Sequence, residues 1–130
     1  MPDLALILTA LLFGGMTFYS FGFAPVLFRQ LPMEQVRPLL RGTFPYYYLA
    51  IIGLGIVAAV VTFPADRLAS GLLGAIVVST LYARQILMHQ INAATDRADK
   101  RAFSMLHGLS VVIQLVQIGL AVWALLILAG

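Results

Sequence analysis

Apolar residues form four long runs along the chain, and the short segments between the runs hold most of the charged residues. The runs cover residues 4–28, 45–63, 68–90 and 103–128. An α-helix rises about 1.5 Å per residue, so about 20 residues cross the hydrocarbon core of a bilayer, which is about 30 Å thick. The pattern therefore predicts an all-α integral membrane protein, in which residues 1–130 form one four-helix bundle.

The last run carries its polar side chains on one face. They follow one another at intervals of three, four and three residues: His107, Ser110, Gln114 and Gln117. This spacing places them on the same face of an α-helix. A polar face in hydrocarbon is unfavourable unless it meets other protein groups or trapped water, so we expect this face to point into the bundle.

The second half of the third run has a polar face with the same spacing. Its members are Tyr82, Gln85, His89 and Asn92. Since the third and fourth runs are consecutive, their two polar faces should lie at the same end of the membrane. Arg84 lies on a different face, close enough to the membrane surface for its side chain to reach water.

The segment between the first two runs predicts a short interfacial helix. Pro32 is suited to the start of a helix, and several apolar residues after it share one side of that helix: Met33, Val36, Leu39 and Leu40. Such a segment lies on the membrane surface, and Pro38 limits its regularity.

The remaining connections differ in length. Residues 64–67 predict a tight turn that makes the second and third spans antiparallel neighbours, and residues 93–102 predict a solvated loop of mixed charge. Small residues in the first run are expected to mark the close approach of a neighbouring helix. They are Gly14, Gly15, Ser20 and Gly22.

Composition supports the membrane assignment. The chain is 62% hydrophobic and 10% charged, which is typical of an integral membrane protein. The net charge of +3 does not indicate nucleic-acid binding, because no basic stripe with interleaved aromatic residues is present. The absence of cysteine excludes disulfides and thiolate metal sites. The expected partners are membrane lipids, with a homo-oligomer or a larger membrane complex as further options.

The distribution of positive charge predicts an orientation. Seven of the eight Lys and Arg residues lie in or next to the connections after the first and third runs, and only Arg67 lies on the other side. Positively charged connections are retained in the cytoplasm. We therefore expect both basic loops in the cytoplasm, both termini outside, and a bacterial inner membrane as the location.

Polar residues from several runs are expected to meet at the cytoplasmic end of the bundle. Such clusters in membrane proteins are candidates for an ion, proton or ligand site. The candidate ligand-binding residues are Tyr46, Tyr47, Arg84, His89, His107, Ser110 and Gln114. Two simpler interpretations remain: the tyrosines can form an aromatic belt at the interface, and the histidines can be hydrogen-bonding partners between helices.

No cofactor or metal is predicted. Met88 with His89 and Met105 with His107 offer ligands that suit Cu(I), but adjacent helical side chains point about 100° apart and cannot easily share an ion. Haem coordination uses histidines on facing helices inside a membrane span, whereas both histidines here lie near one surface. A haem- or copper-binding protein is therefore the weaker alternative, and no motif of an enzyme is present.

Four blocks of sequence resemble a known family. They are residues 14–16 (Gly-Gly-Met), 27–32 (Leu-Phe-Arg-Gln-Leu-Pro) and 44–47 (Phe-Pro-Tyr-Tyr), and Phe103 with 107–110 (His-Gly-Leu-Ser). In this order they are similar to transmembrane protein 205 and the related bacterial proteins of unknown function. The resemblance implies a four-helix membrane protein whose activity is not established, and the animal member is associated with resistance to platinum drugs.

The resemblance also points to individual positions. They are Phe44, Pro45, Tyr46, His107, Gly108 and Ser110. Gln114 stands where the animal protein has Asn, and the connection between the third and fourth runs is much shorter here, so partner contacts of that connection are not implied.

Two functions follow from these observations. The polar stripe favours a small transport or resistance protein that binds a solute or ion at the cytoplasmic end of the bundle. The small size, the glycines of the first run and the lack of a catalytic motif favour a non-catalytic accessory subunit of a larger membrane complex.

Overall fold

The computed structural model describes residues 2–130, which form four helical rods joined by short turns. The rods are, in order, α1 (Pro2–Thr17) with the π-helical turn η1 (Phe18–Phe23) and α2 (Ala24–Gln30); α3 (Met33–Thr62); α4 (Arg67–Tyr82) with the π-helical turn η2 (Ala83–Leu87) and α5 (Met88–Asp96); and α6 (Lys100–Ala129). Because no strand occurs among these residues, the predicted all-α four-helix fold is confirmed.

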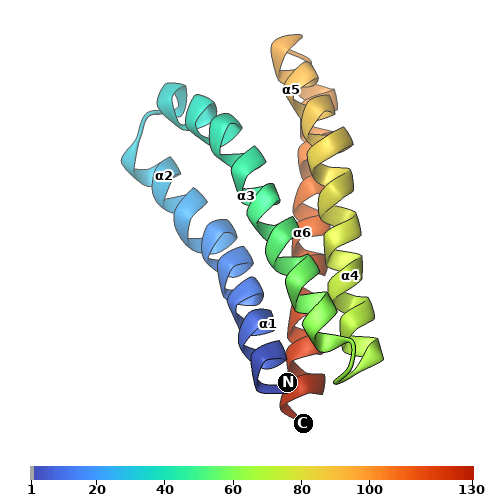
Figure 1. Ribbon diagram of the computed structural model, residues 1–130. Coiled ribbons are helices and arrows are strands. Elements are labelled where there is room, and N and C mark those ends of the chain that lie inside the picture. Colours follow the sequence, from blue (N-terminus) through green and yellow to red (C-terminus); the bar gives the residue numbers. More distant parts are fainter. Residues whose placement is uncertain (1) are drawn as a thin grey trace.

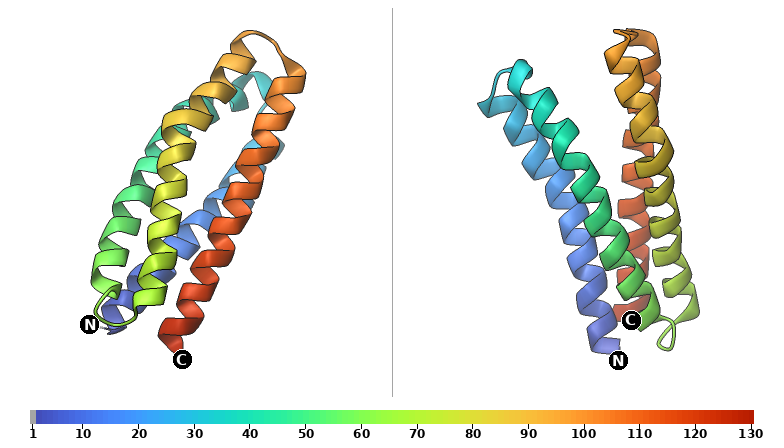
Figure 2. Two further views of the ribbon diagram at one scale, coloured as in Figure 1. Left: turned by 90° about the vertical axis from the view of Figure 1, so that its right-hand side faces the viewer. Right: turned by 45° about the horizontal axis from the view of Figure 1, so that its top comes forward.

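The rods form a bundle in which each contacts two neighbours. α1 packs against α3 and α6, and α4 packs against the same two helices (Figure 1). Both termini and the α3–α4 connection lie at one end of the bundle. The opposite end, which holds the α2–α3 and α5–α6 connections, is called the basic end because Arg37, Arg97, Lys100 and Arg101 lie there. The two helical hairpins diverge towards it (Figure 2).

All four rods are long and apolar enough to cross a membrane. The spans are Asp3–Gln30, Glu34–Thr62, Arg67–Asp96 and Lys100–Ala129. Large apolar side chains such as Val60 and Leu126 are exposed on the outside of the bundle, whereas Leu12, Met16, Leu73 and Ile76 form its core. Such an outer surface suits lipid rather than water, and the chain is therefore a membrane protein.

The short interfacial helix predicted after the first span is not a separate element. α3 begins at Met33 and continues without interruption to Thr62, with Pro38 and Pro45 inside it. Each proline removes one backbone donor, which leaves a single carbonyl without its helical partner, and the flanking turns keep the helix continuous. A helix of 30 residues is about 45 Å long, so its first turns extend beyond a hydrocarbon core of about 30 Å.

The predicted tight turn 64–67 is present as residues 63–66, but the connection between the third and fourth rods is shorter than predicted. The predicted loop 93–102 is mostly helical, and only Arg97–Asp99 separates α5 from α6. Ala98 adopts a positive φ of 56° in this turn. The carboxylate of Asp99 accepts a hydrogen bond from the Ala102 N–H at 3.1 Å and so starts α6. Asp66 starts α4 in the same way, through the Ala69 N–H at 2.9 Å.

α3 and α4 approach each other closely at a glycine that the sequence analysis did not single out. A Cβ atom added to Gly55 in α3 would lie 2.7 Å from Cγ2 of Val77 in α4. By contrast, Gly14 and Gly15 are exposed and a Cβ at either would meet nothing within 4 Å. The expectation that these two glycines mark a contact between helices of this chain was therefore wrong.

Gly55→Ala is predicted to destabilise the bundle. The added methyl group must displace the stiff, β-branched side chain of Val77, which costs about 1–3 kcal/mol of unfolding free energy. The measurement is thermal or denaturant unfolding in detergent micelles. Gly53→Ala is the matched control, because a Cβ there meets nothing within 4 Å and stability should not fall. Equal effects of the two substitutions would contradict this account of α3–α4 packing.

Candidate functional site

Gln114 links three helical rods near the middle of the bundle. Its side-chain amide donates one hydrogen bond to the Tyr47 hydroxyl at 2.6 Å and another to the Ser20 hydroxyl at 2.7 Å. Tyr47 belongs to α3 and Ser20 to η1, whereas Gln114 lies on α6. The predicted inward orientation of the polar stripe therefore holds at this residue, and the stripe satisfies polar groups inside the bundle.

An aromatic cluster surrounds this hydrogen-bonded group. The rings of Tyr19 and Tyr47 stack with centroids 4.0 Å apart, and Phe44 forms a T-shaped pair with each of them. Tyr48 contacts Phe44 and Tyr47, and it is 7% exposed. The buried hydroxyl of Tyr19 has no hydrogen-bond partner among residues 2–130, so it is a polar group that water or a ligand can satisfy.

A hollow of about 80 Å³ lies next to the aromatic cluster, towards the basic end. Three helices form it: α3 belongs to one of the two diverging hairpins, and α5 and α6 belong to the other (Figure 2). Its lining consists of Arg41, Phe44, Tyr48, Met88, Ile91, Asn92, His107 and Ser110. Five of these side chains carry hydrogen-bonding groups and three are apolar, so the hollow suits a small polar group attached to an apolar one.

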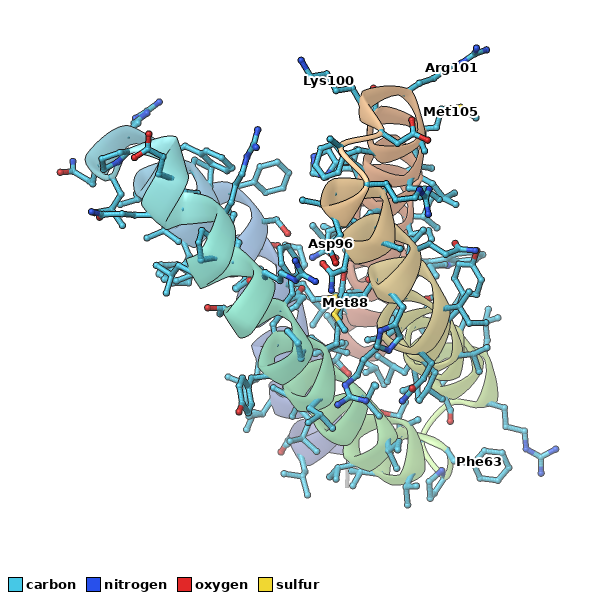
Figure 3. All side chains as sticks on the ribbon, turned by 90° about the horizontal axis from the view of Figure 1, so that it is seen from above. Phe63, Met88, Asp96, Lys100, Arg101 and Met105 are labelled. Carbon is cyan, nitrogen blue, oxygen red and sulfur yellow. The ribbon has the colours of Figure 1, made fainter. Side chains whose placement is uncertain are left out.

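An ion pair joins α3 to α5 beside the hollow. The guanidinium of Arg41 donates to the two carboxylate oxygens of Asp96 at 2.9 and 3.1 Å. Both side chains are largely exposed, at 47% and 60%. Seen from above the basic end, Met88 and Asp96 lie between the two hairpins, whereas Lys100 and Arg101 point away (Figure 3). The pair therefore spans the opening between the hairpins.

Only part of the predicted site comes together. Tyr47 and Gln114 are hydrogen-bonded, and Ser110 and His107 line the hollow. His107 is exposed at its mouth, where its ring stacks on Phe103 with centroids 5.5 Å apart. These residues form one continuous region along α6, from the interior to the surface.

The other predicted residues lie elsewhere. Tyr46 is 74% exposed on the outside of α3, and His89 is exposed together with Tyr82 and Gln85. Arg84 in η2 is half-buried, and its Nε–H donates to the Pro45 carbonyl at 3.4 Å. These placements separate Tyr46, His89 and Arg84 from the hollow, whose lining includes none of them.

The structure adds residues that sequence reasoning missed. Ser20 was predicted only to mark the approach of a neighbouring helix, which it does through Gln114, and Asp96 lies in the predicted loop 93–102. Tyr48 and Arg41 were not proposed as site residues. The triple tyrosine and the charge of Arg41 were visible in the sequence, but no local pattern predicts a contact between residues 55 positions apart.

A second polar group lies deeper, between α4 and α6. The amide of Gln117, which is 3% exposed, donates to the hydroxyls of Ser79 and Thr80 at 2.7 and 2.9 Å. These two hydroxyls also donate to the Ile76 carbonyl, at 3.0 and 2.7 Å. Since the amide nitrogen of Gln117 and both hydroxyls have partners and these residues line neither of the two hollows, we interpret the group as a structural link.

Two further features carry no site. A shallow apolar hollow of about 320 Å³ lies at the opposite end, lined by Ala59, Val60, Phe63 and Ser70, and the Ser70 hydroxyl already donates to the Ala59 carbonyl. Within residues 2–130, no group of three or more His, Asp or Glu side chains is arranged to hold a metal ion. Met105, considered as a copper ligand, is 69% exposed and points away from the bundle (Figure 3).

Gln117→Leu is predicted to weaken the bundle moderately. The substitution removes the hydrogen bonds between α6 and α4, but Ser79 and Thr80 keep their bonds to the Ile76 carbonyl. Because hydrogen bonds between membrane helices are each worth about 0.6–2 kcal/mol, the unfolding free energy should fall by roughly 1–2 kcal/mol in detergent. Gln85→Leu, on the exposed face of η2, is the control and should change little. Equal losses for both would contradict the structural role of Gln117.

Comparison with known proteins gives one match. A family model described as Domain of unknown function (DUF4149) matches residues 7–100. This range covers most of the chain, from α1 to the first residue of α6. No curated protein and no solved structure matches.

Proposed function

The chain belongs to the family described as Domain of unknown function (DUF4149), and we propose that it is a small membrane protein that binds a solute or ion at its basic end, as a transport or resistance protein. The hollow between α3, α5 and α6 is the observation that supports this proposal best. Polar side chains from three helices converge there. Polar groups that gather between membrane helices are candidates for binding a ligand or an ion.

Gln114 extends the hollow into the bundle. Along α6, the polar residues run from His107 at the mouth through Ser110 to Gln114, which bonds Tyr47 and Ser20. The π-helical turn η1 brings Ser20 to this position, and such turns often occur at functional sites. A solute bound at the hollow therefore has a path of polar groups leading towards the middle of the membrane.

The proposal includes a location and an orientation. The positive residues gather at one end, which favours the cytoplasmic side of a bacterial inner membrane for the basic end and the outer side for both termini. The resemblance to transmembrane protein 205 supports the resistance role. The proposal assigns binding and movement of a solute to the chain, and no catalysis.

The orientation can be tested with single cysteines, because the chain has none of its own. Ala65→Cys lies in the α3–α4 turn and Thr95→Cys lies near the end of α5, and both positions are exposed. In intact cells a membrane-impermeant maleimide should label Ala65→Cys only, and after permeabilisation it should label both. Labelling of Thr95→Cys in intact cells would place the basic end outside and contradict the proposed orientation.

Transport can be tested in proteoliposomes that contain the purified chain. The panel of probes is inorganic phosphate, butyrate, rubidium and tetraethylammonium. At least one should cross faster than in protein-free vesicles, and His107→Ala and Gln114→Leu should each reduce the flux at least about tenfold, since each removes a polar group from the path.

The chain offers matched controls for this measurement. His89→Ala removes an exposed histidine outside the hollow, and Gln117→Leu removes a buried glutamine of α6 that lies away from it. Both should keep most of the flux per folded molecule. Equal losses in the variants and in their controls would contradict a solute path along His107 and Gln114.

An accessory subunit is the second candidate. The exposed glycines Gly14 and Gly15 leave open space on α1, which suits close approach of a helix from another chain. Co-purification distinguishes the two candidates. A partner present at fixed stoichiometry, together with no flux of any probe, would favour the accessory subunit over the transport protein.

A further inference from the structure

The hollow has a definite electrostatic character. Its lining contains the guanidinium of Arg41, the hydroxyls of Tyr48 and Ser110, the amide of Asn92 and the imidazole of His107. None of its lining residues is acidic. Arg41 can only donate hydrogen bonds, and the other four can all donate. Such a site disfavours a cation and favours a group that carries negative charge and accepts hydrogen bonds.

The charge of Arg41 is already engaged by Asp96. The bidentate geometry of this pair is the one in which a guanidinium binds any carboxylate or phosphate. Because both partners are largely exposed, water and dissolved ions compete for them, and the pair is weak. An oxyanion that also bonds Tyr48 or Ser110 in the hollow gains contacts that Asp96, outside the lining, does not make.

The Arg41–Asp96 pair also holds the two hairpins together at the basic end. It is the only ion pair between two helical rods among residues 2–130, since the other described pair joins Arg97 and Asp99 within one turn. It connects the two hairpins at the end where they diverge (Figure 3). Deeper in the bundle α3 stays attached through the Arg84–Pro45 and Gln114–Tyr47 hydrogen bonds. Loss of the pair therefore frees the mouth of the hollow without dismantling the bundle.

We infer that the ligand of this hollow is an oxyanion, a carboxylate or a phosphate group, which takes the place of Asp96 on Arg41 and so releases α5 from α3. The inference rests on the proposed function and names the class of its ligand. Two sources offer this chemistry, a small soluble anion and the phosphate of an anionic lipid. The apolar part of the lining, Phe44, Met88 and Ile91, accommodates the carbon chain of either kind of ligand.

The first experiment measures binding. The whole protein is placed in phosphatidylcholine nanodiscs and titrated calorimetrically with inorganic phosphate and with butyrate. Asp96→Asn should bind roughly twofold to fivefold more tightly than wild type, because the internal competitor is gone, and Arg41→Gln should bind at least about tenfold more weakly.

Each variant has a charge-matched control. Asp99→Asn removes an acid three residues from Asp96, and Asn remains a good cap for α6. Arg37→Gln removes an exposed positive charge one helical turn before Arg41. Both controls should bind as wild type does. An equal change of binding affinity in a variant and in its control would show a general effect of charge and overturn the inference.

The second experiment measures the separation of the two hairpins at the basic end. Spin labels on Gln35→Cys of α3 and Gln90→Cys of α5, both exposed positions, report the distance between the hairpins. In wild type the distance should increase when phosphate or butyrate is added. In Asp96→Asn it should already be long without anion, and in Arg41→Gln it should be long and insensitive to anion. A wild-type distance that no oxyanion changes would overturn the inference.

Nanodiscs that contain phosphatidylglycerol identify the source. If the distance between the spin labels increases in these discs without added anion, the ligand is the lipid phosphate. If it increases only with added phosphate or butyrate, the ligand is a soluble anion.

The inference and the proposed function can fail separately. Flux of rubidium or tetraethylammonium that depends on Gln114 but not on Arg41 would overturn the oxyanion alone, whereas oxyanion binding at Arg41 without any flux would overturn transport alone.

Discussion

The structure depends on one constraint, the lack of hydrogen-bonding partners in hydrocarbon. Every polar group within the spans must find a partner in the protein or in trapped water. Gln117 meets this requirement with Ser79 and Thr80, and Gln114 meets it with Tyr47 and Ser20. These contacts fix the rotation of α6 about its own axis, because a turned helix would expose both amides to lipid.

The same constraint acts unevenly along the membrane normal. Near the termini and in the middle of the bundle, apolar side chains such as Leu73 and Ile76 fill the core, and Gly55 allows α3 and α4 to approach closely. Towards the basic end the helices extend beyond the hydrocarbon, so polar groups there do not have to be paired inside the protein. The hairpins can therefore diverge at this end, and the hollow lies where the packed region changes into the divergent one.

Much of this arrangement could be predicted from the sequence. The length of the apolar runs predicted four helices, and the spacing of Gln114 and Gln117 predicted an inward polar face, because both signals are local and periodic. The face that contains His89 has the same period, yet Tyr82, Gln85 and His89 are exposed and only Asn92 lines the hollow. For His89, the position near the end of the third rod explains the exposure, since a polar side chain outside hydrocarbon is not forced inward. Pro38 was expected to limit the regularity of a short interfacial helix, but α3 is continuous through it, because a helix tolerates the loss of one hydrogen bond.

The candidate site was harder to predict, because its contacts join distant parts of the chain. Arg41 and Asp96 lie 55 positions apart, and Gln114 and Ser20 lie 94 apart. No periodicity within one helix encodes such pairs. No local pattern favours Tyr47 over Tyr46 either, since the choice depends on how α3 is rotated by its packing against α1 and α4.

The tight contact between Gly55 and Val77 holds α3 against α4 far from the basic end. From Gly55 to Arg41 the helix measures about 21 Å, and the hydrogen bonds of Pro45 and Tyr47 lie between these two residues. The proposed release of α5 from Arg41 leaves these contacts in place, so the opening it implies is confined to the basic end and the opposite end keeps its packing.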